Sequence, residues 1–333
     1  MVNKEQIQSG IFGFVVGDAY GVPYEFLKRN DERLKKIEDM KAYGTHNQPS
    51  GTWSDDSSMT LSTMQSIVDN DGKINYDDIM NKYVDWAVKA KYTATDTLFD
   101  IGNSTYKAIN KYLSHRYSPT ECGGKSVYEN GNGSLMRMLP VIFDLYDSDL
   151  TDTQKNNIIN EYSSLTHANE ISQMGCHIYY DFVSNIMDGL SKNEAYEKVK
   201  QINYKQYYND SSIEKYKRIL NGSLDTLSQA EISSSGYVVD TLEASIWLIL
   251  HTNSYEELVK KAVSLGDDTD TVSAISGSIG GLIYGYNNIP KEWLDKIKKK
   301  DQINQLCLNF TECLNKKNIN KEDNYNESSC TRR

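Results

Sequence analysis

The chain has 333 residues, 38% of them hydrophobic with 24 tyrosines, and carries a formal net charge of −10 at pH 7. This composition is sufficient for a sizeable core, and negative charge without a long basic block argues against nucleic acid as the main partner. Five widely spaced cysteines suggest neither a zinc site nor a disulfide framework. The polar N-terminus lacks a signal-peptide pattern, and the most apolar run, 272–285, is too short to span a bilayer. We therefore expect a cytoplasmic protein without a membrane partner.

Apolar residues at helical spacing predict helices along the chain. The first, over residues 7–20, places Ile7, Ile11 and Phe14 on one face and ends before Gly21 and Pro23. The charged segment 29–40 is predicted as a surface helix, and 43–53 as a polar loop. Further helices are predicted at 54–69, 76–91, 97–114, 151–165, 170–186, 192–202, 211–221, 236–251, 255–265, 266–285 and 291–314, with a glycine turn into a helix after 131.

Few segments alternate with period two, and neither an internal repeat nor a shift in composition divides the chain. The simplest architecture is all-α, with one compact multi-helix domain over residues 1–314. The polar remainder, 315–333, is predicted to be a frayed tail. We expect the protein to be a monomer.

The acidic segment at 266–271 (GDDTDT) is the most distinctive motif. It opens an apolar helix whose small residues recur at spacings of three and four, so that neighbouring helices can approach its backbone closely. Acidic side chains are favoured at a helix N-terminus, and capping is one interpretation of Asp267, Asp268 and Asp270. Three carboxylates within four positions exceed what a cap requires, and they repel one another unless a cation or protons compensate. We favour a cation site.

A second acidic cluster, residues 54–57 (SDDS), opens another predicted helix and also has the composition of an N-cap. Its carboxylates and hydroxyls match those of Asp268, Asp270 and Thr271. Donor sets made only of oxygen select Mg²⁺, Mn²⁺ or Ca²⁺ over zinc or copper. If the fold brings the two clusters together, they can hold two ions about 4 Å apart, as in two-metal hydrolases.

Other polar residues have both a functional and a structural interpretation. The turn 131–134 (GNGS) can offer backbone N–H groups to a phosphate or sugar, or it is an ordinary tight turn. Arg137 faces an anion or forms a surface ion pair. Glu25, after the break at Pro23, is a base or a solvated charge. His167 contacts a ligand or has a structural role at a helix start.

Seven segments, in order, resemble the ADP-ribosylglycohydrolase family, which includes the dinitrogenase-reductase-activating glycohydrolase and the ADP-ribosyl-acceptor hydrolases. They are GDAYGVPYE at 17–25, WSDDSSM at 53–59, FDIGNST at 99–105, GNGSLMR at 131–137, THAN at 166–169, GYVVDTLEA at 236–244 and GDDTDTVSAISGSIGG at 266–281. The resemblance covers nearly the whole chain, and the two acidic motifs are its distinctive parts.

The resemblance implies an all-α fold with a centre of two Mg²⁺ or Mn²⁺ ions. The metal ligands it implies are Ser54, Asp55, Asp56, Asp268, Asp270 and Thr271. The catalytic residues it implies are Glu25, on a loop near the reacting end, Asp55, Asp56 and Asp100. The substrate contacts it implies are Asn103, Asn132, Gly133, Ser134, His167 and Tyr237, the tyrosine ring being suited to stacking on adenine.

Asp100 and Asn103 match the arginine-directed members of the family, in which an aspartate faces the guanidinium of the modified arginine. A fixed carboxylate opposite a planar fork of donors gives bidentate recognition. The alternative is that Asp100 caps the helix predicted at 97–114. The chain departs from the family pattern at Ser54, where threonine is common, and at Asp267, where a second glycine is common and an extra acid could alter metal binding.

We therefore predict a metal-dependent hydrolase that cleaves the glycosidic bond between ADP-ribose and a modified protein side chain, with arginine as the expected side chain. Its partner is an ADP-ribosylated protein and its product is free ADP-ribose. The alternatives are a serine-directed hydrolase of the same kind, a non-catalytic ADP-ribose binder or regulatory member of the family, and a two-metal phosphohydrolase.

Overall fold

The structure, a computed structural model, describes the backbone of residues 2–330 and the side chains of residues 2–317. Its regular elements are helices, and between residues 2 and 330 the only β-type pairings are isolated bridges. The all-α prediction is confirmed. No helix in the described part of the chain combines the length and apolarity needed to cross a bilayer.

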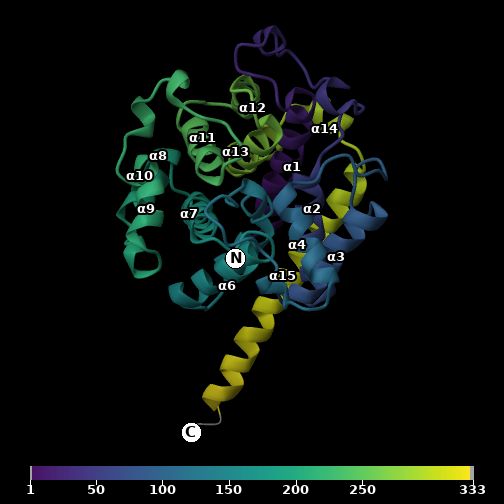
Figure 1. The fold of residues 1–333 in the computed structure, drawn as a ribbon. Helices are drawn as coiled ribbons and strands as arrows, with labels where there is room; N and C mark the ends of the chain where they lie inside the picture. The colour runs from purple at the N-terminus through teal and green to yellow at the C-terminus, as the bar shows by residue number, and fades with distance from the viewer. Residues whose placement is uncertain (1, 331–333) are drawn as a thin grey trace.

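Helix α13 (Thr269–Tyr284) lies against α1 (Lys4–Gly21) near the centre of the molecule (Figure 1). Glycines let the two backbones meet, because a Cβ at Gly17 would lie 2.1 Å from the carbonyl oxygen of Ser273. A Cβ at Gly277 would likewise lie 2.4 Å from the carbonyl oxygen of Gly13. The small residues of α13 therefore permit the close approach that the sequence predicts.

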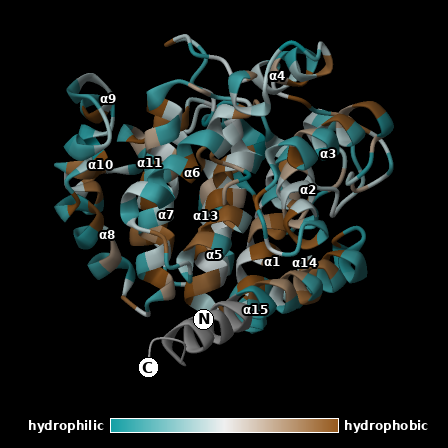
Figure 2. Ribbon diagram, turned by 90° about the horizontal axis from the view of Figure 1, so that it is seen from below, coloured by the Kyte–Doolittle hydropathy of each residue, from teal (hydrophilic) through white to brown (hydrophobic). Residues whose placement is uncertain are grey.

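The other helices surround this pair. Helices α7 (Glu170–Met187), α11 (Val238–Leu250) and α12 (Tyr255–Ser264) pack on α13, while α2 (Asp55–Asp69) contacts α3 (Tyr76–Lys89) and α15 (Lys300–Cys330). The remaining helices are α4 (Asn103–Leu113), α5 (Leu139–Tyr146), α6 (Asp152–Ser164), α8 (Lys192–Gln201), α9 (Asp210–Lys215), α10 (Lys217–Leu220) and α14 (Lys291–Lys296). Figure 2 shows hydrophobic residues concentrated along α1, α5 and α13, as a shared core requires.

The prediction of a surface helix at 29–40 is wrong. Only a short 3₁₀ turn forms there, at Glu32–Lys35. The segment buries few side chains, Leu34 and Met40 among them, so packing does not stabilise a helix. At its start, the guanidinium of Arg29 donates to three backbone carbonyls, including that of Leu265 at 2.9 Å, and ties the chain to the loop before α13.

Helix α4 begins at Asn103, six residues later than predicted, and residues 97–102 form no regular secondary structure. Its N-cap is Gly102, which makes no side-chain capping bond, so the alternative interpretation of Asp100 as a helix cap is wrong. Leu98 and Ile101 of this segment pack against the core and hold it in place.

The C-terminal segment differs from the prediction in two places. The helix expected at 291–314 is divided into α14 and α15, with Lys299 at φ +51° between them. The backbone of α15 continues past residue 314 to Cys330. Because side chains after residue 317 and all of 331–333 lie outside the described residues, the frayed tail stays a prediction.

Candidate active site

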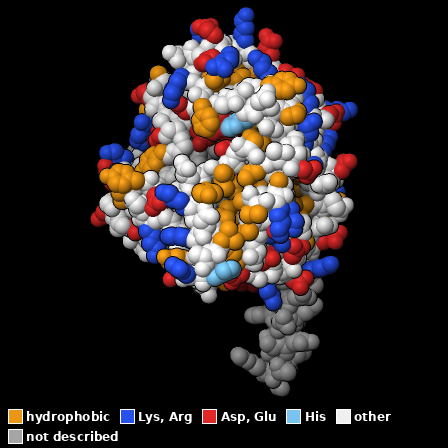
Figure 3. Space-filling model, turned by 45° about the vertical axis from the view of Figure 1, so that its right-hand side comes forward, with side chains coloured by type: hydrophobic (Ala, Val, Ile, Leu, Met, Phe, Trp, Pro, Cys, Tyr) orange, Lys and Arg blue, Asp and Glu red, His pale blue; other side chains and the backbone are white. Residues whose placement is uncertain are grey.

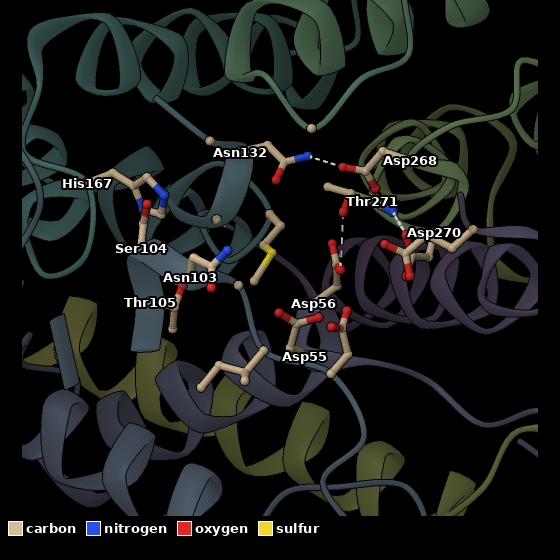
Figure 4. Close-up of a pocket in the computed structure, with 18 of the residues that line it drawn as sticks. Asp55, Asp56, Asn103, Ser104, Thr105, Asn132, His167, Asp268, Asp270 and Thr271 are labelled. Carbon is tan, nitrogen blue, oxygen red and sulfur yellow. Dashed lines mark hydrogen bonds between the residues drawn. The ribbon is translucent and has the colours of Figure 1, made fainter. Parts of the chain in front are cut away.

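The two acidic helix starts meet at one pocket of about 420 Å³. The N-termini of α2 and α13 contribute Asp55, Asp56, Asp268, Asp270 and Thr271 to its wall. The hydroxyl of Thr271 donates to Asp56 Oδ2 at 3.3 Å and so connects the helix starts directly (Figure 4). Figure 3 shows carboxylates within a hollow on one face of the molecule, with hydrophobic side chains at its edge.

Asp18, buried on α1, fixes the start of α2. Its carboxylate accepts from the backbone N–H groups of Ser54 and Ser57, both at 3.0 Å, and from the Ser57 hydroxyl at 2.5 Å. Two N–H groups at the helix start are thereby satisfied by a residue from another helix. Sequence analysis missed Asp18, although it lies within the segment 17–25.

Ser54 is the N-cap of α2 and is buried. Its hydroxyl accepts from the Asp56 backbone N–H at 3.2 Å and lies 3.1 Å from Asp56 Oδ2. It is not among the residues that line the pocket. Its role as a metal ligand therefore remains a proposal.

Glu25 and Asp100 extend the acidic side of the pocket from two loops. The Glu25 carboxylate is hydrogen-bonded to His46 Nε2, and the Thr45 hydroxyl donates to the Glu25 carbonyl at 2.7 Å. Glu25, His46, Asp100 and Asp270 each offer a ligand atom within 4.8 Å of the others. The sequence analysis placed His46 in a polar loop and did not identify it as a site residue. The one signal in the sequence was that His46 lies close to the acidic cluster at 54–57.

The carboxylates on the acidic side of the pocket are buried close together, so that without a cation they repel one another. Burial first, and neighbouring carboxylates second, raise the pKa values of Asp55, Asp56 and Asp270 well above the usual range. Burial raises the pKa of Glu25 to about 7, opposed by its hydrogen bond to His46. It also raises the pKa of Asp100.

Two buried carboxylate oxygens, Asp56 Oδ1 and Asp268 Oδ1, have no hydrogen-bond partner among the described residues. Buried polar atoms are nearly always paired, so these oxygens are available to a ligand. Oxygen donors of this kind suit hard divalent cations such as Mg²⁺ and Mn²⁺. The residues present therefore fit the expected metal centre.

The opposite side of the pocket consists of amide, hydroxyl and imidazole groups. Asn132 and Gly133, from a 3₁₀ turn, line it together with Asn103, Thr105 and His167. The Asn132 amide donates to Asp268 Oδ2 at 2.7 Å, which joins the two sides. Figure 4 shows His167 facing the pocket from the side opposite Asp270 and Thr271.

Two predicted substrate contacts lie just outside this lining. Ser134 is fully buried, and its hydroxyl oxygen lies 3.0 Å from that of Ser163. Tyr237 is the half-buried N-cap of α11, and its backbone forms a bridge with Gly131. Contact of either residue with a ligand remains a prediction.

Two further residues are placed differently from the predictions. Arg137 neither faces an anion nor forms a surface ion pair, because it is fully buried and donates to carbonyl groups of α6. Asp267 is turned away from the acidic cluster. It adopts φ +58°, a conformation that favours glycine, and its carboxylate accepts from Lys28 Nζ at 2.6 Å.

An all-α fold whose helix starts gather carboxylates around one pocket defines a hydrolase-type site with a place for hard cations. A profile of the ADP-ribosylglycohydrolase family matches residues 2–320. The protein belongs to the ADP-ribosylglycohydrolase family and is a glycosyl-bond hydrolase, as the sequence predicts.

Individual relatives agree with this assignment. The chain is 30% identical over 317 residues to a Serratia proteamaculans protein named ADP-ribosylarginine hydrolase Tri1, covering 91% of this chain and 78% of the relative. It is 25% identical to the ADP-ribosyl-(dinitrogen reductase) glycohydrolase of Rhodospirillum rubrum, over 86% of this chain and 88% of the relative. A solved structure titled ADP-ribosylglycohydrolase-related protein complex matches with a TM-score of 0.78 at 23% identity, over 93% of this chain and 98% of that one, and shows the same fold.

Proposed function

We propose that the protein removes ADP-ribose from arginine side chains of modified proteins. Hydrolysis breaks the bond between ribose C1″ and a guanidinium nitrogen, while water supplies a hydroxyl to C1″ and a proton to the departing nitrogen. The observation that carries the proposal is Asp100, which the irregular segment before α4 presents at the acidic side of the pocket. A carboxylate there can pair with the planar guanidinium. Relatives from Serratia proteamaculans and Pseudomonas putida, 30% and 29% identical, are named ADP-ribosylarginine hydrolases.

The acidic side is proposed to hold two Mg²⁺ or Mn²⁺ ions. The proposed ligands are Ser54, Asp55, Asp56, Asp268, Asp270 and Thr271. Such ions would offset the repulsion among the carboxylates, orient the ribose hydroxyls and lower the pKa of bound water. The unpartnered oxygens of Asp56 and Asp268 support this assignment.

Glu25 is proposed to accept the proton of the attacking water on Oε1, because Oε2 is bonded to His46. Departure of the guanidine leaves an oxocarbenium-like ribose, which the neighbouring carboxylates stabilise. Asn103, Asn132, Gly133, Ser134, His167 and Tyr237 are proposed to hold the rest of the ADP-ribose. We further propose that the protein works as a cytoplasmic monomer on ADP-ribosylated protein and releases ADP-ribose.

The test is incubation with arginine- and serine-ADP-ribosylated substrates in Mg²⁺, Mn²⁺ or EDTA, with the product identified by mass spectrometry. We expect free ADP-ribose from the arginine substrate only, and only with metal. Release from the serine substrate would contradict the assignment of Asp100. Binding of ADP-ribose without release from either substrate would instead identify a binding protein, and release of phosphate or AMP a phosphohydrolase.

A further inference from the structure

Arg137 is a fully buried cation that the proposed reaction does not use. No carboxylate pairs with its guanidinium among residues 2–317, and it donates instead to the carbonyl oxygens of Tyr162, at 3.2 Å, and Ser163, at 3.4 Å, in the last turn of α6. The negative end of the helix and the ring of Tyr162, 4.4 Å away, offset part of the cost of burial. Because buried charge is costly to retain, a role beyond packing is expected.

A short hydrogen-bond relay connects this cation to the pocket. Arg137 Nη2 lies 2.7 Å from Thr166 Oγ1, which lies 2.8 Å from His167 Nδ1. The His167 backbone is held as well, because its N–H donates to the Ser163 carbonyl at 2.8 Å and its carbonyl accepts from the Ser163 hydroxyl at 2.8 Å. The imidazole is therefore fixed from two sides.

The donors and acceptors in this relay determine where the imidazole carries its proton. Arginine only donates, so Thr166 Oγ1 accepts from Arg137. The single hydroxyl proton of Thr166 is then left for His167 Nδ1, the other polar partner of Oγ1 among the described residues. A ring whose Nδ1 accepts, and which is not doubly protonated, has its proton on Nε2. Burial, and secondly the charge of Arg137, lower the pKa of His167 to about 3, which keeps the ring singly protonated near pH 7.

The Nε2 edge of the ring faces the glycine turn of the pocket. A Cβ at Gly131 would lie 3.4 Å from His167 Nε2, and one at Gly133 would lie 2.8 Å from Cε1. His167 is 2% exposed, and among the described residues the hydrogen bond of its ring is made through Nδ1. The absence of side chains on these glycines leaves Nε2 open to the pocket.

We propose that Arg137 and Thr166 are positioning residues, which fix the proton of His167 on Nε2 so that the imidazole donates a hydrogen bond into the pocket. The group it recognises is an oxygen acceptor of the ligand, such as a phosphoryl oxygen, and a group that can only donate is rejected. This inference deepens the proposed function, on which the identity of the ligand rests. The position of the proton itself is independent of the ligand.

The test is a long-range ¹H–¹⁵N NMR spectrum of the full chain labelled with ¹⁵N-histidine, which has five histidines to resolve. His167 is assigned as the signal missing from His167→Gln. We expect its Nε2 to be protonated and its Nδ1 to be unprotonated, without change between pH 5 and pH 8. A proton on Nδ1, or titration within that range, would overturn the proposal.

The relay is tested with Thr166→Val, which removes the hydroxyl at nearly constant volume, and Thr166→Ser, which keeps it. We expect Val to move the Nδ1 resonance and to weaken ADP-ribose binding by calorimetry about 5- to 10-fold, and Ser to preserve both. An unmoved Nδ1 resonance in the Val variant would exclude Thr166 from the relay. If Val does not fold, the wild-type and Ser spectra still report the proton. If ADP-ribose does not bind the wild type, the proposed function fails while the spectra still decide this inference.

Discussion

Asp267 and Asp268 are adjacent in the sequence, but the backbone turns their side chains to different environments. Asp267 pairs with Lys28 at 2.6 Å, whereas Asp268 lines the pocket and accepts from Asn132 at 2.7 Å. The positive φ of Asp267 produces the separation. A run of acids in sequence thus contains both a surface ion pair and a candidate metal ligand.

This pair provides a matched test of the metal centre. Asp268→Asn removes a charged candidate ligand at constant size, and we expect calorimetry to show Mn²⁺ affinity lower by about 10- to 100-fold or more. Asp267→Asn is the control, because it removes only an exposed ion pair, and its affinity should remain within about twofold of wild type. Equal effects of the two substitutions would argue against the assigned ligands.

The sequence did not predict a role for His46, yet its imidazole is hydrogen-bonded to the Glu25 carboxylate. His46→Phe keeps an aromatic ring between Phe26 and Phe99, whose centroids lie 5.8 and 5.3 Å from the imidazole, but removes the hydrogen bond. Loss of a bond to a charged group costs about 1.5–3 kcal/mol, so we expect kcat to fall about 10- to 100-fold with KM nearly constant. Steady-state kinetics on the arginine substrate measure this, with partial recovery expected in His46→Gln. A rise in KM alone would place His46 in substrate binding instead.

At the scale of elements, the site depends on how closely α1 and α13 pack. Tyr255 on α12 reinforces their contact, because its hydroxyl donates to the Gly13 carbonyl at 2.6 Å. Helix α13 begins with the acidic motif, and Asp18 on α1 anchors the start of α2. A shift of α1 against α13 therefore moves the carboxylates at the two helix starts relative to each other.

Gly277→Ala tests this packing. The added Cβ would lie 2.4 Å from the Gly13 carbonyl oxygen, and backbone cannot yield as a flexible side chain does. We expect the free energy of unfolding to fall by about 3 kcal/mol or more in urea titrations. The control is Ser276→Ala on the same helix, which removes a hydroxyl bonded to the Val272 carbonyl at 2.7 Å and should cost about 1 kcal/mol or less. Equal losses would mean that close backbone contact is not what holds α13.

At the scale of the whole molecule, Asp181 on α7 is a partly buried acid outside the pocket. Burial raises the pKa of Asp181 to about 7, opposed by the hydroxyl of Tyr204, which donates to it at 2.7 Å. A carboxyl whose pKa is raised on folding adds stability below its unfolded pKa, near 4. That contribution is lost as the pH rises through the folded value of about 7.

Asp181→Asn removes this titration and keeps an acceptor for Tyr204. Between pH 5 and pH 7.5 we expect the wild type to lose about 2 to 3 kcal/mol of unfolding free energy relative to the variant. Urea titrations of both proteins at the two pH values measure the difference. A constant difference between them would show that Asp181 titrates normally.

The sequence by itself determined most helices, the all-α class, the family and nearly every carboxylate of the site. These follow from hydrophobic periodicity and from short motifs, both of which are properties of neighbouring residues. It failed at 29–40 and at the start of α4, where tertiary contacts decide whether a polar segment becomes helical.

Only the tertiary structure brought Glu25, Asp56, Asp100 and Asp268 to one pocket. It also turned Asp267 away, placed His46 on Glu25, and buried Arg137 behind His167. Each of these outcomes depends on contacts between segments far apart in the chain. Burial, the orphaned oxygens and the resulting pKa shifts arise from those contacts, because desolvation depends on what surrounds a side chain in space and local sequence does not encode it.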